Sequence, residues 1–235
     1  MEQARIQPES RMVYHTDPRS PAADRFRFLR MRLREFAKDG KLKRLLVTSP
    51  TAGDGKTTAI LNLATALSER GKRKVLVVEA DLHRASIAEA LKLRAWRGLT
   101  ECLTDDTESP FAAIRNIEPL GWSLLPAGEP RGNPTELLQT PALGALLDRV
   151  AGRFDWVLID APPVLCFTDA ISLHQHVDGT LLIARAGKTA RDSLKQTLVL
   201  LGPKKIVGVV LNAVEQSQLR RLQAEYSSTR RFEEE

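Results

Sequence analysis

The residues best suited to chemistry lie between Ser49 and Thr58, which read S-P-T-A-G-D-G-K-T-T. An apolar run precedes them, and apolar residues at helical spacing follow. A strand, a glycine-containing turn and a helix in this order bind phosphate when the turn ends in Gly-Lys-Ser/Thr. Gly53 and Gly55 let the backbone turn sharply, so that several N–H groups can point at one anion. The pattern therefore predicts a site for the phosphates of a nucleotide.

The side chains at the end of this loop indicate the cofactors. Lys56 is expected to reach the β- and γ-phosphates, and the Thr57 hydroxyl to ligate Mg²⁺, so we expect ATP and Mg²⁺. In the strict pattern a glycine stands five residues before Gly55, but this chain has Pro50 there, so the loop is a variant. The expected cofactor-binding residues of the loop are Gly53, Asp54, Gly55, Lys56, Thr57 and Thr58.

Carboxylates follow two further apolar segments, which we predict to be buried strands over 74–80 and 155–160. Glu79 and Asp81 stand two residues apart at the end of the first, and Asp160 ends the second. In open α/β sheets, ligands bind at the carboxyl ends of the strands. The sequence therefore predicts that these carboxylates lie beside the phosphate loop.

The roles expected of these residues follow from their chemistry. Mg²⁺ prefers hard oxygen ligands, so Thr57, Asp81 and Asp160 are the expected metal ligands. Lys56, Glu79 and Asp81 are the expected catalytic residues. Lys56 would neutralise phosphate charge, while Glu79 or Asp81 would orient or deprotonate the acceptor.

Strands and helices alternate along the chain, which is typical of an α/β protein with a mostly parallel central sheet and helices on both faces. We therefore expect a phosphate-loop NTPase fold. The remaining expected strands are 122–125, 180–184 and 206–211, and the expected helices include 22–37, 141–150 and 189–202. Residues 94–118 are expected to form surface connections with a short helix.

The 235 residues suit one such domain. Three parts are expected: an irregular N-terminal arm over 1–20, the phosphate-loop ATPase or kinase domain over 21–213, and a polar helix with a disordered tail over 214–235.

The composition indicates a protein of the cytoplasm. Residues 1–10 lack the apolar core of a signal peptide, and no apolar run approaches the about 20 residues of a membrane helix. Cys102 and Cys166 are expected to be free thiols in a reducing compartment. The net charge of +6 suggests an anionic partner such as ATP, an acidic protein or lipid headgroups, and does not choose among them.

The helix predicted over 22–37 carries a stripe formed by Asp24, Arg27, Arg30 and Arg34. On spacing alone, this stripe is a solvated basic face held partly by an Asp24–Arg27 pair.

Together, these motifs resemble those of the bacterial tyrosine kinases of capsule and exopolysaccharide assembly, the BY-kinases. The likeness covers about 18–212, and the first phosphate motif of that family also lacks the leading glycine. The other matching segments, in the family's order, are Asn62-Leu63-Ala64, E-A-D-L-H-R, Gly128 with N-P-T-E-L-L, I-D-A-P-P, T-D-A, V-D-G and G-V-V-L-N.

The resemblance implies an enzyme that uses Mg·ATP to phosphorylate protein tyrosine, or that hydrolyses ATP, and so regulates exopolysaccharide polymerisation or export. It also implies a separate membrane polysaccharide chain-length (co-polymerase) protein, which would activate the chain and recruit it to the inner face of the plasma membrane. Asp24, Arg27 and Arg30 are similar to the family's E-x-x-R-x-x-R oligomerisation motif, which implies a homo-oligomer. Asn212 matches the asparagine on the adenine side of the nucleotide. No nucleic-acid partner is expected.

This chain departs from the family pattern in three ways. The second motif, D-x-D-x-R in the family, has Glu79 in place of the first aspartate and His83 in place of the arginine. The C-terminal tyrosine cluster is missing, and Tyr226 is the single phosphoacceptor candidate in the tail. We therefore expect ATP binding or hydrolysis with weak or no tyrosine autophosphorylation.

Two alternatives stay open. A non-catalytic, ATP-sensing assembly regulator is compatible with the substitutions at Glu79 and His83 and with the missing tyrosines. A MinD/ParA-type positioning ATPase is less well supported, because such proteins carry a second lysine five residues before the loop lysine, where this chain has Thr51.

Overall fold

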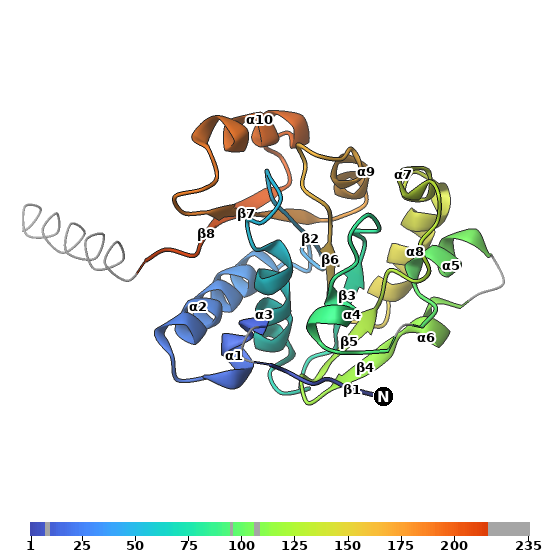
Figure 1. The fold of residues 1–235 in the computed structure, drawn as a ribbon, viewed down its shortest axis with the longest axis horizontal. Helices are drawn as coiled ribbons and strands as arrows, with labels where there is room; N and C mark the ends of the chain where they lie inside the picture. The colour runs from blue at the N-terminus through green and yellow to red at the C-terminus, as the bar shows by residue number, and fades with distance from the viewer. Residues whose placement is uncertain (8–9, 95, 106–108, 216–235) are drawn as a thin grey trace, which may run out of the picture.

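The computed structural model describes residues 1–7, 10–94, 96–105 and 109–215. These residues form one eight-stranded sheet flanked by helices (Figure 1). The strands are β1 (Glu2–Gln3), β2 (Arg44–Thr48), β3 (Val75–Glu79), β4 (Arg115–Glu118), β5 (Trp122–Leu125), β6 (Trp156–Asp160), β7 (Gly179–Arg185) and β8 (Ile206–Asn212). The helices are α1 (Val13–Thr16), α2 (Pro21–Phe36), α3 (Lys56–Ser68), α4 (Ile87–Ala90), α5 (Leu99–Thr104), α6 (Pro110–Ala113), α7 (Pro134–Leu137), α8 (Pro141–Ala151), α9 (Asp169–Gln175) and α10 (Arg191–Leu201).

The strand order is β1-β4-β5-β3-β6-β2-β7-β8, and all neighbours are parallel except β4 and β5. Strands β3, β6 and β2 lie side by side in the centre, and β3 and β6 are buried along their whole length. Strands covered on both faces must be apolar throughout, which explains their unbroken runs of Val, Leu and Ile. The predicted mostly parallel α/β sheet is confirmed.

Helices cover both faces of the sheet, as predicted. Helices α2 and α3 contribute to one hydrophobic cluster, and α8 and α9 contribute to a second. Figure 1 shows α10 on the opposite side of the β7–β8 end from α2 and α3. Among the described helices, none is long and apolar enough to cross a membrane.

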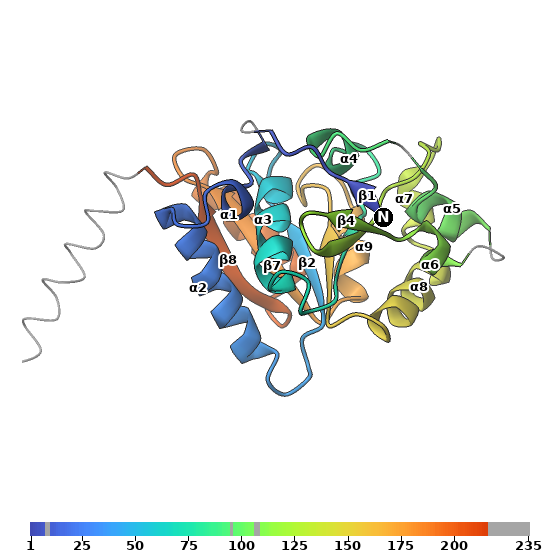
Figure 2. The same ribbon diagram turned by 90° about the horizontal axis from the view of Figure 1, so that it is seen from below.

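The N-terminal segment is more ordered than the sequence predicts. Strand β1 pairs with β4, the Met12 side chain is fully buried, and Figure 2 shows the segment passing from β4 to α1 beside α3. Asn62 of α3 holds the segment: its Oδ1 accepts a hydrogen bond from Tyr14 N (2.9 Å), and its Nδ2 donates to Arg11 O (3.0 Å). The prediction of an irregular arm over 1–20 is therefore wrong for β1 and α1. Elements this short carry no periodicity, and their order comes from partners distant in the sequence.

The segment over 94–118 also holds more structure than the one short helix predicted, because it contains α5, α6 and β4. The domain boundaries at 20/21 and 213/214 stay predictions. The predicted tail beyond residue 215, including Tyr226, lies outside the described residues.

Asp178 ties the start of β2 to the start of β7. One carboxylate oxygen accepts hydrogen bonds from the backbone N–H groups of Lys43 (3.0 Å) and Arg44 (2.7 Å). The other accepts from Arg44 Nε (3.2 Å) and Nη2 (2.8 Å). Burial disfavours the carboxylate, but these hydrogen bonds outweigh burial and lower the pKa of Asp178.

Asp178→Asn should lower the free energy of unfolding by about 1–3 kcal/mol at pH 7, because the new amide group faces hydrogen-bond donors. The folded-state pKa lies below the unfolded value of about 3.9, so the contribution is complete above that pH and is lost as pH falls through the folded pKa. Urea denaturation at pH 7 and pH 3 should show the difference between wild type and variant shrinking at the lower pH.

Asp148→Asn is the matched control. Asp148 also contacts Arg44 (2.5 Å), but its side chain is 72% exposed, so we expect a loss below about 1 kcal/mol. Equal losses for the two variants would contradict the role assigned to Asp178.

Candidate active site

The predicted phosphate loop follows β2 at the carboxyl edge of the sheet. Its base is fixed to the segment after β6: Thr48 Oγ1 donates to Pro162 O (2.7 Å), and Val164 N donates to Ser49 O (2.9 Å). The loop is therefore held on the central strands, where the sequence places it.

The two glycines adopt the conformations that the loop requires. Gly53 has φ +81° and Gly55 φ +91°, both in the left-handed region that favours glycine. A Cβ at Gly53 would lie 2.4 Å from Lys188 Nζ, and one at Gly55 would lie 2.2 Å from Asn212 Nδ2. Neither position can accept a side chain without displacing these groups.

Asp54 braces the loop with its side chain, which is fully buried. Its Oδ2 accepts hydrogen bonds from the backbone N–H (3.0 Å) and hydroxyl (3.1 Å) of Thr51, and its Oδ1 accepts from the Thr189 hydroxyl (2.8 Å). Asn212 Nδ2 donates to Asp54 O (2.9 Å), so the predicted adenine-side asparagine contacts the loop. With its carboxylate and its carbonyl engaged in these contacts, Asp54 fixes the shape of the loop.

Lys56, Thr57, Asp81 and Asp160 meet in one cluster. Lys56 Nζ lies 2.7 Å from Asp81 Oδ2 and 3.8 Å from Asp160 Oδ1, and Thr57 Oγ1 donates to Asp160 Oδ2 (3.0 Å). The sheet register explains this arrangement, because the last residue of β3 pairs with Asp160 and the loop emerges from β2 on the other side of β6. The predicted proximity of these side chains is confirmed.

The two carboxylates of the cluster are buried, Lys56 and Thr57 are partly buried, and the charges perturb one another. Burial raises the pKa of Asp160 to about 6, even though the Lys56 ammonium opposes this. Burial disfavours the Lys56 ammonium, but the nearby carboxylates of Asp160 and Asp81 outweigh it and raise the pKa of Lys56. The site thus concentrates negative charge that needs a cation.

The donor set fits Mg²⁺. Within the described residues, Asp160 Oδ1 is a buried oxygen without a hydrogen-bond donor, although Lys56 Nζ lies at 3.8 Å. The same residues contain no group of three or more His, Cys, Asp or Glu side chains placed to hold a metal ion. Mg²⁺ is commonly bound by one or two carboxylates together with substrate phosphates, so Thr57, Asp81 and Asp160 are suitable ligands.

Glu79 faces a different set of partners from Asp81. Its Oε1 accepts hydrogen bonds from the backbone N–H groups of Ser86 and Ile87, both at 2.7 Å, and its Oε2 accepts from Ala127 N (3.3 Å). Burial raises the pKa of Glu79, while these hydrogen bonds oppose the rise. The carboxylate thus holds the chain after β3 against the chain after β5, and this geometry does not favour the predicted action of Glu79 on an acceptor.

Three segments that carry the family resemblance meet at Asp169, which is fully buried. One of its oxygens lies 2.7 Å from His83 Nε2, and the other accepts from the Thr135 hydroxyl (2.7 Å). The His83 ring also stacks on Phe167, with ring centroids 3.9 Å apart. His83 therefore binds a carboxylate at the position where the family has arginine. Sequence reasoning identified the three segments but not their contact.

The turn between β7 and α10 closes over the phosphate loop, a feature that the sequence analysis missed. Lys188 Nζ donates to Ala52 O (2.9 Å), and Arg185 Nη1 donates to Gly53 O (3.2 Å). Both cations follow the strand predicted over 180–184, and residues after a parallel strand lie at the carboxyl edge of the sheet, so their place beside the loop was predictable.

The predicted oligomerisation residues lie away from this site, on α2. Arg27 contacts Asp24 and Pro18 O, as predicted for the Asp24–Arg27 pair. Arg30 Nη1 donates to Ala66 O (3.1 Å) at the end of α3. These contacts lie within one chain, and the subunit contact stays a prediction.

Comparison with known proteins identifies the class to which this fold and site belong. The chain belongs to the family described as the CobQ/CobB/MinD/ParA nucleotide binding domain, which it matches over residues 45–232.

Within this class, the chain is related to bacterial tyrosine kinases. It is 29% identical over 209 residues to a tyrosine-protein kinase of Bacillus subtilis, with 88% of this chain and 87% of the relative covered. It is 36% identical over 175 residues to a tyrosine-protein kinase of Acinetobacter johnsonii, with 74% of this chain covered. The match spans only 24% of the length of the Acinetobacter protein.

Solved structures agree with this relationship. The kinase domain of the Escherichia coli tyrosine kinase ETK superposes with a TM-score of 0.82 at 27% identity, covering 87% of this chain and 80% of that one. Cobyrinic acid a,c-diamide synthase from Mycobacterium smegmatis, with a bound ATP analog and magnesium, gives a TM-score of 0.58 at 25% identity over 72% of each chain. The BY-kinase resemblance and the phosphate-loop fold are confirmed.

Lys188→Met should weaken nucleotide binding by about tenfold, because it removes a cation held 2.9 Å from a carbonyl of the phosphate loop. Lys188→Arg should retain much of the affinity. Calorimetric titration with ATP and Mg²⁺ measures both variants. Lys195→Met removes a lysine from the exposed side of α10 and is the control. Equal affinities for Lys188→Met and Lys195→Met would contradict a role for Lys188 at the loop.

Proposed function

We propose that the chain binds Mg·ATP at the phosphate loop and transfers the γ-phosphoryl group to protein tyrosine, or to water. We further propose that this turnover regulates exopolysaccharide polymerisation or export. The observation that carries the proposal is the partly buried cluster of Lys56, Thr57, Asp81 and Asp160 at the end of the loop. The relatedness to tyrosine-protein kinases and the ATP analog and magnesium bound by the Mycobacterium smegmatis relative support it.

Each residue of the cluster has its own role in the proposed phosphoryl transfer. Lys56 exchanges its carboxylate partners for phosphate oxygens and neutralises their charge. Thr57, Asp81 and Asp160 would hold Mg²⁺, which supplies further charge neutralisation when bound. The acceptor oxygen attacks the γ-phosphorus, its proton passes to a carboxylate, and ADP leaves. Asp81 suits this last role better than Glu79, because the Glu79 carboxylate is held by three backbone N–H groups.

The same fixation of Glu79 favours one second candidate, a non-catalytic regulator that senses ATP. In such a protein the nucleotide would order the segment from Asp81 to Ile87, whose position already depends on Glu79. Turnover separates the two functions, because the regulator binds ATP without releasing ADP.

Lys56→Met should lower the affinity for Mg·ATP by at least about 100-fold, and any rate of ADP release by a similar factor. The reason is that the Lys56 ammonium neutralises phosphate charge and does not contribute to core packing. Asp160→Asn should abolish the tightening of nucleotide binding by Mg²⁺. Calorimetry with and without Mg²⁺, together with an ADP-release assay, measures both effects. Lys38→Met, on the exposed surface, is the control. Unchanged affinity in Lys56→Met would remove the proposed site.

The same incubation, followed by mass spectrometry, tests the acceptor. We expect ADP release with little or no phosphate on Tyr226, because it is the single tyrosine among residues 214–235. The incubation is repeated with the cytoplasmic segment of a candidate membrane partner. Stoichiometric phosphate on Tyr226 would instead establish an autokinase. ATP binding without ADP release in either incubation would establish the regulator.

We also propose that the chain forms a homo-oligomer through Asp24, Arg27 and Arg30, and acts in the cytoplasm beside a membrane polysaccharide co-polymerase protein that activates and recruits it. The similarity to the putative tyrosine-protein kinase EpsB of Ralstonia nicotianae supports the proposal of a kinase in this setting.

The double variant Arg27→Glu/Arg30→Glu should shift any oligomer toward monomer, because it reverses two charges at the proposed contact. Light scattering measures the mass of the particles. Arg25→Glu/Arg32→Glu introduces the same charge change at exposed positions of the same helix and should leave the mass unchanged. If both double variants kept the particle mass of the wild type, the stripe would be a solvated face.

A further inference from the structure

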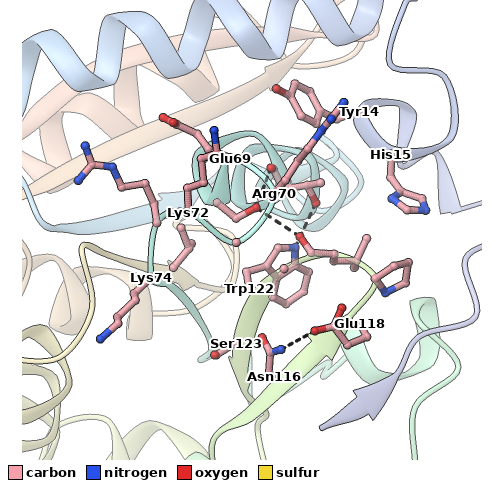
Figure 3. Close-up of a pocket in the computed structure, with 18 of the residues that line it drawn as sticks. Tyr14, His15, Glu69, Arg70, Lys72, Lys74, Asn116, Glu118, Trp122 and Ser123 are labelled. Carbon is pink, nitrogen blue, oxygen red and sulfur yellow. Dashed lines mark hydrogen bonds between the residues drawn. The ribbon is translucent and has the colours of Figure 1, made fainter.

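A large cavity of about 1000 Å³ opens beside the end of α3 (Figure 3). Its walls are the end of α3, the turn over 69–74, the β4–β5 turn and the α1–α2 region. Lys74 directly precedes β3 and Gly121 directly precedes β5, so the cavity lies at the amino ends of these strands. The proposed catalytic residues do not contribute to it.

The lining is strongly basic. It contains six Arg and Lys side chains and two carboxylates: Arg27, Arg30, Arg70, Lys72, Arg73, Lys74, Glu69 and Glu118. Arg34, which lies outside the lining, contacts Glu69 (2.6 Å), and Asn116 donates to Glu118 (2.8 Å). In the part of the chain that the structure describes, the four cations over 70–74 have no ion pair, and all four are exposed.

The turn that carries these four cations has a fixed shape. Glu69, Arg70 and Gly71 all lie in the left-handed region, at φ +48°, +61° and +82°. The turn is closed by a hydrogen bond from Arg73 N to Ser68 O (3.0 Å) and anchored by one from Lys74 N to the Asp155 carboxylate (2.8 Å). Figure 3 shows Arg70, Lys72 and Lys74 following one another along it. Non-glycine residues adopt this conformation only where surrounding structure enforces it, and here it places consecutive cations around one cavity.

The opposite wall presents two guanidinium groups that are already positioned. Arg30 Nη1 donates to Ala66 O (3.1 Å) and lies 3.4 Å from the Tyr14 hydroxyl. The Arg27 guanidinium lies 5.5 Å from the centre of the Tyr14 ring. Side chains held in this way lose little conformational freedom when they bind a ligand in a chain whose Arg27 and Arg30 are not engaged in the proposed subunit contact.

We propose that this cavity binds a small anion carrying two or more phosphate groups. Guanidinium forks and ammonium groups are the side chains that recognise phosphate. A concave site of this volume suits a small ligand better than a flat bilayer or a nucleic-acid duplex. The carbonyl end of α3 attracts cations only within its last turn, so it does not explain Lys72, Arg73 and Lys74, which follow the helix.

Calorimetry with inorganic tripolyphosphate tests the proposal on the full chain saturated with Mg·ADP, and on Lys56→Met, so that the phosphate loop does not contribute. The variant Arg70→Asn/Lys72→Gln/Lys74→Gln removes three cations, and asparagine tolerates the left-handed conformation at position 70. Lys38→Gln/Lys41→Gln/Lys204→Gln removes three exposed lysines elsewhere and is the control. Hexaglutamate and vesicles containing anionic lipid are the competing probes.

We expect tripolyphosphate to bind in both backgrounds. Its affinity should fall at least tenfold in the cavity variant and should change less than twofold in the control variant. Equal losses in the two variants would reduce the effect to overall charge and overturn the proposal. If tripolyphosphate bound neither to the chain saturated with Mg·ADP nor to Lys56→Met, the proposal would also be overturned. Tighter binding of hexaglutamate or vesicles than of tripolyphosphate would overturn the ligand class.

Discussion

The site depends on the interaction of one partly buried lysine with two buried carboxylates. Asp81 and Asp160 are 4% and 1% exposed, and neither charge would be stable there without Lys56 between them. Because Asp160 Oδ1 lies beyond hydrogen-bond distance of Lys56, the compensation is incomplete. A magnesium ion and a phosphate chain would complete it: the ion would neutralise the carboxylates, and the phosphates would take the ammonium. The charges of the cluster therefore favour binding of the magnesium ion and the phosphate chain together.

The sheet makes this interaction possible. Strands β3, β6 and β2 are neighbours, so residues distant in the sequence reach one edge without long connections. Side chains around the cluster then fix the loops: Asp54 holds the phosphate loop, Glu79 the segment after β3, and Asp169 the segment that carries His83. Each of these three carboxylates is satisfied within the protein, which leaves Asp81 and Asp160 as the pair available for a ligand.

Much of this was predictable from the sequence because the signals are local. The glycine loop with Lys56 follows one apolar strand, Asp81 follows a second, and Asp160 ends a third, so the sequence predicts all three at the carboxyl edge. The role of Glu79 was not predictable, because its hydrogen-bond donors are backbone groups whose positions depend on the fold. The same holds for Asn62, whose side chain orders the N-terminal segment. The place of Lys188 at the carboxyl edge was predictable, but its contact with the loop depends on how the β7–α10 turn packs.

A crystal structure of the chain with Mg²⁺ and a non-hydrolysable ATP analogue is the most direct test of the central claim. We expect the metal beside Thr57 and Asp160, and Lys56 bonded to phosphate oxygens instead of Asp81. An analogue bound elsewhere, or one bound at the loop with the Lys56–Asp81 contact still at 2.7 Å, would contradict the claim that this charge cluster exists to bind Mg·ATP.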